Sequence, residues 1–345
     1  MLAQTRVQFV PFRWDDRHDK VLMSRDADRD WIVLSPTSGA IVAALDEGGT
    51  IEEVQGSLGP ERDAPDVLAF VRELQDIGFV EAFGQGHRGS SRLVPRPSPR
   101  AGASWRILVL ATAAAVGYVG WSLVSAAVAA PQGADLVLPG TGVGTALTVL
   151  LGVSLATAAV HELAHVRVAR RLGLSPHVTM SGRELWSVVR TSLVGIWGLE
   201  RRMQWRPVAA GLMADAVMLA AATAVCGLVD PTTTLAHVAR LTTAVLAARM
   251  IWQAQWYLRT DVYFLFAVLN GAVNLRRTAR LWLRAKLLGR TATGRNAASE
   301  LHDEPASEVA AARMYCLSLP AAFLATAVLW GWFIIPFGRT VVERL

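Results

Sequence analysis

Long uncharged stretches follow one another along the chain from residue 107 onward. Each is close to the roughly 20 apolar residues that an α-helix needs to cross a bilayer. They are Ile107–Ala134, Leu136–Val160, Pro207–Val229 with Asp215 inside it, Pro231–Leu258 with His237, Arg240 and Arg249 inside it, and Met314–Gly338. Asp261–Leu275 is shorter and is typical of a re-entrant or interfacial segment. The pattern predicts a mainly α protein, with a transmembrane bundle of about five to six spans over residues 105–340.

The first 83 residues have a different pattern, in which short apolar runs alternate with charged turns. Val7–Phe12, Lys20–Ser24 and Trp31–Leu34 are rich in β-branched and aromatic residues, which is typical of strands. Patterns with helical spacing follow them. We therefore predict a small α+β domain over residues 1–83.

Three helices are predicted in this domain. The first opens at Ser35-Pro36-Thr37-Ser38. Thr50 and Glu53 have the spacing of a capping box and open the second. Asp63 and Pro65 are expected to open the third. The apolar side of the third helix is formed by Val67, Phe70, Val71, Leu74 and Ile77.

Polar segments separate and flank the apolar stretches. Residues 84–104 are rich in Gly, Ser, Pro and Arg, which predicts a flexible linker that leaves the first domain near the membrane without fixed docking. Residues 183–206 mix Arg with apolar residues and predict an interfacial strand or hairpin. The basic segment 276–310 could contact anionic lipid or a partner, although a solvated loop is the simpler interpretation.

Composition and charge agree with a membrane protein. Of the 345 residues, 52% are hydrophobic, and the net charge of +6 comes from Arg beside the apolar stretches rather than from a nucleic-acid-binding surface. The two cysteines, Cys226 and Cys316, lie inside apolar segments, which excludes a disulfide framework and a cysteine zinc site. Residues 1–20 lack the apolar core of a signal peptide. The positive-inside rule then predicts an inner (plasma) membrane protein with a cytoplasmic N-terminal domain.

The sequence His161-Glu162-Leu163-Ala164-His165 closes the second apolar stretch. Two histidines four residues apart lie on one helical face and can bind one metal ion. Glu162 lies beside them and can act as general base on a metal-bound water. Arg167, Arg170 and Arg171 follow, which places the motif near the cytoplasmic side. Since polar groups are costly at membrane depth, this context favours a catalytic zinc site.

A catalytic zinc ion takes three protein ligands, so one ligand remains to be found. Asp261 and Asp215 are the carboxylates near membrane depth, and each has a structural alternative: Asp261 as a helix cap or partner of Arg259, and Asp215 as a buried hydrogen-bonded carboxylate. His237 would supply a third imidazole but is expected near the external face. His177 is expected in a loop.

These elements together resemble the site-2 protease (M50) family of intramembrane zinc metallopeptidases over roughly residues 105–275. In that family the third ligand is an aspartate in an LDG or DGYY element, which Thr260-Asp261-Val262-Tyr263-Phe264 resembles. The resemblance implies Zn²⁺ bound by His161, His165 and Asp261, with Glu162 as catalytic base. Val262 stands where the family usually has Gly. The stretch 210–215 is similar to the family's small-residue helix, on which Asp215 would tune the pocket.

The N-terminal domain is similar to PqqD-like winged-helix domains, which bind the leader peptides of ribosomally made, modified peptides. The closing segment Leu74–Val80 carries this resemblance, and Trp31–Leu34 would bind the leader by strand addition. The fusion resembles the membrane proteases of daptide-type peptide biosynthesis.

The implied function is a zinc endopeptidase that cleaves the leader from a precursor peptide held by residues 1–83. Two alternatives remain open on sequence alone. One is regulated intramembrane proteolysis of a membrane-bound signalling protein. The other is a non-catalytic membrane scaffold or export partner.

Overall fold

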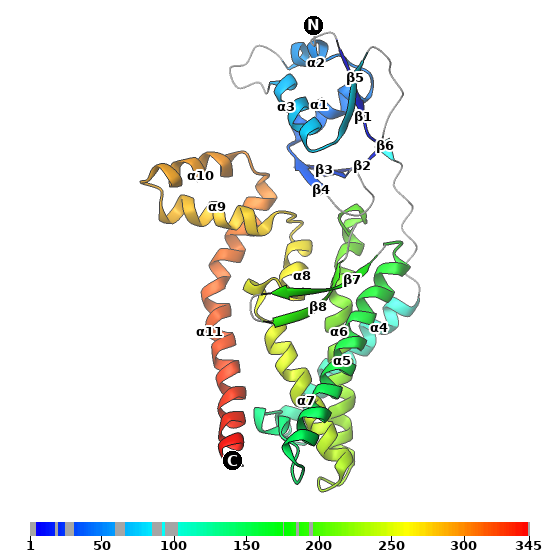
Figure 1. Ribbon diagram of the computed structural model, residues 1–345, viewed down its shortest axis with the longest axis vertical. Helices are drawn as coiled ribbons and strands as arrows, with labels where there is room; N and C mark the ends of the chain where they lie inside the picture. The colour runs from blue at the N-terminus through cyan, green and yellow to red at the C-terminus, as the bar shows by residue number, and fades with distance from the viewer. Residues whose placement is uncertain are drawn as a thin grey trace. The chain divides into compact units, whose positions relative to one another are not determined.

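The computed structural model is mainly helical, with a few short strands (Figure 1). The structure describes residues 5–17, 20–24, 31–58, 66–84, 92–93, 103–174, 176–183, 186–192 and 196–343. Within these ranges, four helices are long and apolar enough to cross a membrane: α4 (Ala103–Val124), α5 (Val143–Arg171), α6 (Arg201–Leu228) and α11 (Ala306–Val342). Most of the linker 84–104 lies outside the described residues.

Two predicted membrane segments have a different character in the structure. Pro231–Leu258 contains helix α7 (Thr234–Gln253). This helix is less apolar because it carries two arginines, and it is not among the four membrane-spanning candidates. Helix α8 (Asp261–Leu269) has 9 residues, so its length of about 14 Å is roughly half the thickness of a bilayer core. The span number of five to six therefore stays a prediction.

The chain divides into two compact units. The first contains residues 1–98, 194–200 and 271–313. Its strands are β1 (Arg6–Phe9), β2 (Phe12–Arg17), β3 (Lys20–Ser24), β4 (Trp31–Leu34), β5 (Val80–Gly84) and β6 (Arg92–Leu93). Strands β1 and β5 form an antiparallel pair, and the other four are ordered β4-β3-β2-β6, so β4 is an edge strand among the described residues.

The helices of this unit are α1 (Pro36–Asp46), α2 (Ile51–Ser57), α3 (Val67–Asp76), α9 (Leu275–Leu287) and α10 (Ala292–His302). The capping box of Thr50 and Glu53 is confirmed, since each side chain accepts a hydrogen bond from the other residue's backbone N–H. The predicted start of the third helix is wrong, because Asp66 caps it; Asp63 and Pro65 lie outside the described residues. Ile77 is 44% exposed, because it follows the last helical residue and does not share the apolar side.

The predicted strand Val7–Phe12 is two strands. β1 ends at Phe9, and β2 begins at Phe12 and forms an antiparallel hairpin with β3. Pro11 lies at the break and has no N–H to donate to a ladder. The charged turn predicted after this run is instead strand, since Asp15 and Asp16 of β2 pair with β3 and this pairing outweighs their local preference.

A buried ion pair joins β3 to the first turn of α11 within the first unit, and hydrogen bonds extend it to the segment before α9. Lys20 Nζ donates to the carbonyl oxygen of Gly271 at 2.6 Å and to Glu308 Oε1 at 3.0 Å, and both charged side chains are buried. The same Glu308 oxygen accepts from the backbone N–H of Val273 at 2.6 Å. Since an unpaired buried charge is costly, this network fixes the first domain to the 271–313 segment.

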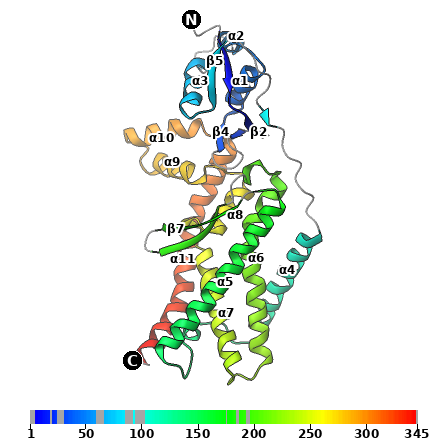
Figure 2. The ribbon, with the colours of Figure 1, turned by 45° about the vertical axis from the view of Figure 1, so that its right-hand side comes forward.

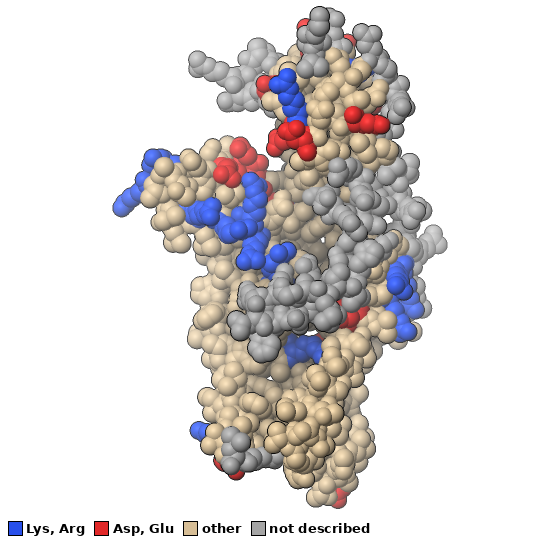
Figure 3. All heavy atoms as spheres, in the orientation of Figure 1, with Lys and Arg blue, Asp and Glu red and all other residues tan. Residues whose placement is uncertain are grey.

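The second unit contains residues 99–193, 201–270 and 314–345. Helix α6 is central and packs against α4, α5, α7 and α8 (Figures 1 and 2). In Figure 3, the surface of the long helices of this unit carries few charged side chains, whereas Lys and Arg gather over α9. The predicted hairpin at 183–206 is displaced: it is formed by β7 (His177–Arg183) and β8 (Trp186–Ser192), while residues 201–206 begin α6.

Candidate metal centre

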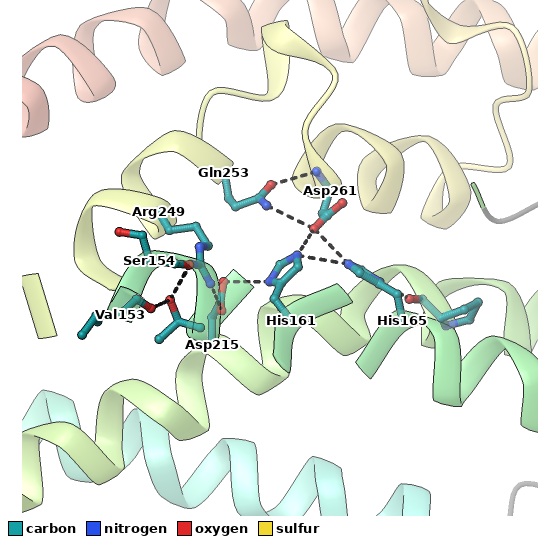
Figure 4. A network of polar contacts seen from close by, with 10 residues as sticks. Val153, Ser154, His161, His165, Asp215, Arg249, Gln253 and Asp261 are labelled. Carbon is teal, nitrogen blue, oxygen red and sulfur yellow. Dashed lines mark hydrogen bonds and ion pairs between the residues drawn. The ribbon is translucent and has the colours of Figure 1, made fainter. Parts of the chain in front are cut away.

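The two histidines of the HELAH sequence lie on one face of α5, where both side chains are buried. Their Nε2 atoms lie 3.2 Å apart, and each imidazole is 3% exposed. This is the arrangement that the spacing of four residues predicts on a helix. A pair of imidazole nitrogens therefore faces one point beside α5 (Figure 4).

The opposite ring nitrogens are held by α6. Nδ1 of His165 lies 2.6 Å from the carbonyl oxygen of Pro207, and Nδ1 of His161 lies 2.9 Å from Oδ2 of Asp215. A carbonyl or carboxylate oxygen can only accept, so each Nδ1 carries the hydrogen and donates it. In the neutral imidazole the Nε2 atom then has a free lone pair, which is the form that binds a metal.

Asp261 brings a third electron pair to the same point. Its Oδ2 atom lies 3.0 Å from Nε2 of His161 and 3.2 Å from Nε2 of His165. With both imidazoles neutral, these three atoms have no hydrogen between them and repel one another unless a positive charge lies among them. Three donors around one zinc-sized tetrahedral ion would be separated by about 3.3 Å, close to the distances observed. These three residues could hold a metal ion.

Gly211 on α6 allows both imidazoles to lie close to this helix. A Cβ atom added at this position would lie 2.3 Å from Nε2 of His165, and 2.5 Å and 2.6 Å from Nε2 and Cε1 of His161. It would therefore clash with both imidazole rings where they hold the proposed ligand atoms. The absence of a side chain at Gly211 therefore lets both histidines take these positions.

No protein family model, curated protein or solved structure matches this chain. The chemistry of the site follows from its own geometry.

The structure separates the roles of the two candidate aspartates. Asp261, the first residue of α8, faces the Nε2 atoms, whereas Asp215 contacts Nδ1 of His161 and neither Nε2 atom. Among the described contacts, His237 and His177 do not join the cluster: His237 lies in the first turn of α7, and His177 lies in β7 rather than in a loop. Glu162 is half-buried on α5 beside the histidines.

Sequence reasoning missed several residues that support the site. Gln253 of α7 and Pro207 of α6 contact the ligands, and Arg249 of α7 contacts Asp215. An arginine inside an apolar stretch is a recognisable signal, because such a charge needs a buried partner. Pro207 has no such signal, since its backbone oxygen, not its side chain, makes the contact.

Gly211→Ala is expected to abolish metal uptake, because its Cβ would clash with both imidazoles and displace their Nε2 atoms. The matched control is Gly227→Ala on the same helix, whose Cβ would meet only Val128 at an ordinary 3.5 Å. Both changes favour the helix by about 1 kcal/mol, so a general effect on α6 cancels. Metal content of the two purified proteins is the measurement, and equal content would contradict the assignment.

Asp261→Ala is expected to lower metal affinity further than Asp215→Ala. The first change removes a direct donor, whereas the second removes a partner of a donor, which typically costs about 10–100-fold. Competition with a metal indicator measures both affinities. A protein that keeps its metal after Asp261→Ala but loses it after Asp215→Ala would reverse the two roles.

Proposed function

We propose that the chain is a multipass membrane zinc endopeptidase whose metal ligands are His161, His165 and Asp261. The observation that supports this best is the convergence of two imidazole lone pairs and a carboxylate beside a membrane-type helix. Two histidines and one carboxylate with an open fourth position form a typical catalytic zinc site. When bound, zinc lowers the pKa of its water and polarises the scissile carbonyl.

Glu162 is the proposed general base. It follows His161 directly on α5 and is half-buried, so it lies at the edge of the face that carries both ligands. Its carboxylate takes a proton from the attacking water while the water oxygen bonds to the carbonyl carbon. The same proton passes to the departing nitrogen as the C–N bond breaks, and the second proton of the water stays on its oxygen, which leaves a carboxylic acid and an amine.

The substrate class that fits the two units is a precursor peptide with a leader. Strand β4 is an edge strand among the described residues, so an added strand could pair with its outer side. Hairpin β7–β8 packs against α5 and offers a second strand edge for an unwound substrate. In this proposal the N-terminal domain is cytoplasmic and holds the leader while the metal site cleaves it off.

Glu162→Gln is expected to reduce cleavage of the precursor by about 10²–10⁴-fold, the usual contribution of a general base. Metal content should stay unchanged, since Glu162 is not a ligand in this scheme. Glu343→Gln, at an exposed position near the end of α11, is the control. Undiminished cleavage by Glu162→Gln would exclude the mechanism. Cleavage of a membrane signalling protein but not of the precursor would instead favour regulated intramembrane proteolysis.

A precursor shortened at the far end of its leader is expected to show a KM raised about tenfold or more, with kcat nearly unchanged. The reason is that the N-terminal domain raises the local concentration of substrate without contacting the reacting bond. Steady-state kinetics on full-length and shortened precursors in detergent or liposomes give both constants. An unchanged KM would show that the leader is not bound outside the metal site.

A further inference from the structure

Helix α7 directs two polar side chains toward the metal centre without supplying a ligand. Arg249 and Gln253 are four residues apart and therefore lie on one face of the helix. Figure 4 shows that Arg249 points to Asp215 and Gln253 points to Asp261. Arg249 thus contacts Asp215, which touches the ligand His161, and Gln253 contacts the ligand Asp261.

Arg249 joins three helices through its guanidinium group. Nη1 donates to Oδ1 of Asp215 at 3.1 Å, and Nη2 donates to Oγ1 of Thr157 at 2.6 Å and to the carbonyl oxygen of Ser154 at 3.2 Å. Thr157 and Ser154 lie one and two turns before His161 on α5. The planar fork of arginine suits several acceptors at once, which the single charge of lysine cannot reproduce.

Asp215 transmits this contact to a metal ligand. Its two carboxylate oxygens are divided, with Oδ1 accepting from Arg249 and Oδ2 accepting from Nδ1 of His161. The side chain is 0% exposed, so the arginine charge compensates a carboxylate that has no access to water. The ionised carboxylate then fixes the orientation of the imidazole and keeps its Nε2 lone pair directed at the metal position.

Gln253 holds the other ligand by a reciprocal pair of hydrogen bonds. Its Nε2 donates to Oδ2 of Asp261 at 3.2 Å, and its Oε1 accepts from the backbone N–H of Asp261 at 3.0 Å. The backbone oxygen of Gln253 also accepts from Thr260 Oγ1 at 2.7 Å. The amide therefore fixes both the carboxylate and the first turn of α8 that carries it.

We propose that Arg249 and Gln253 are positioning residues of the metal centre, acting on His161 through Asp215 and on Asp261 directly. The inference rests on the metal site of the proposed function. It goes beyond that site because it assigns the ligand geometry to α7, which supplies no ligand. A merely structural role would require only that Arg249 neutralise Asp215, with no effect on the bound metal.

The test measures metal binding by the full-length protein. Arg249→Met keeps the length of the side chain and removes its charge and donors, and Zn²⁺ affinity is expected to fall about 10–100-fold. Arg249→Lys should recover part of the loss. Arg240→Met, on the same helix but outside the described contacts of the site, should bind Zn²⁺ like the wild type.

The visible absorption of bound Co²⁺ should change in Arg249→Met and Gln253→Leu and stay unchanged in Arg240→Met.

A double-mutant cycle tests the route through Asp215. If Arg249 acts through this carboxylate, Asp215→Asn combined with Arg249→Met should lose no more affinity than the more damaging single change. Losses that multiply would overturn the route. If Arg249→Met fails to fold, Gln253→Leu and Arg249→Lys still report the Co²⁺ spectrum, and wild-type spectra in both would overturn the proposal.

The outcomes separate this inference from the proposed function. Wild-type affinity and spectrum in Arg249→Met and Gln253→Leu would overturn the inference while peptide cleavage could stand. Weakened metal binding in these variants, with no cleavage by the wild-type protein, would support the inference and exclude the endopeptidase.

Discussion

The second unit depends on one interaction, the convergence of Nε2 of His161, Nε2 of His165 and Oδ2 of Asp261 on one point beside α5. Each Nδ1 atom faces an oxygen that can only accept, so neutral imidazoles must direct bare Nε2 atoms at each other and at Asp261. In a medium with little water this repulsion is strong, because nothing screens it. A cation at this point would reverse its sign, while α6 and α7 hold the three side chains through Asp215, Pro207 and Gln253.

The spacing of four residues recurs on each helix around that point. On α5 it relates Thr157, His161 and His165; on α6 it relates Pro207, Gly211 and Asp215; on α7 it relates Arg249 and Gln253. Residues four apart lie on one face of a helix, so each helix presents one face to the point where the ligands meet. These faces of α5 and α6 run in opposite directions, since His165 meets Pro207 and His161 meets Asp215. Polar groups that would be costly at membrane depth thereby satisfy one another.

The sequence was sufficient for the parts of the site that depend on local spacing. Two histidines on one turn of an apolar helix require no knowledge of the fold, and the capping box of Thr50 and Glu53 is equally local. The choice between Asp215 and Asp261 could not be made from the residues alone, because both lie at membrane depth and only the packing decides which nitrogen each one faces. The same holds for Arg249, whose charge was visible while its partner, 34 positions away, was not. Strand β2 was missed because its pairing with β3 outweighs the turn preference of its acidic residues.

The composition of the first unit affects how a leader peptide would be delivered in the proposed function. A flexible linker alone would set the local concentration of a bound leader by its length. Residues 1–98 instead form one compact unit with residues 194–200 and 271–313, and the buried pair of Lys20 and Glu308 fixes this association. The chain therefore passes between the units at several points rather than through one tether. Delivery of a leader would then depend on the fold of the 271–313 segment as well as on the linker.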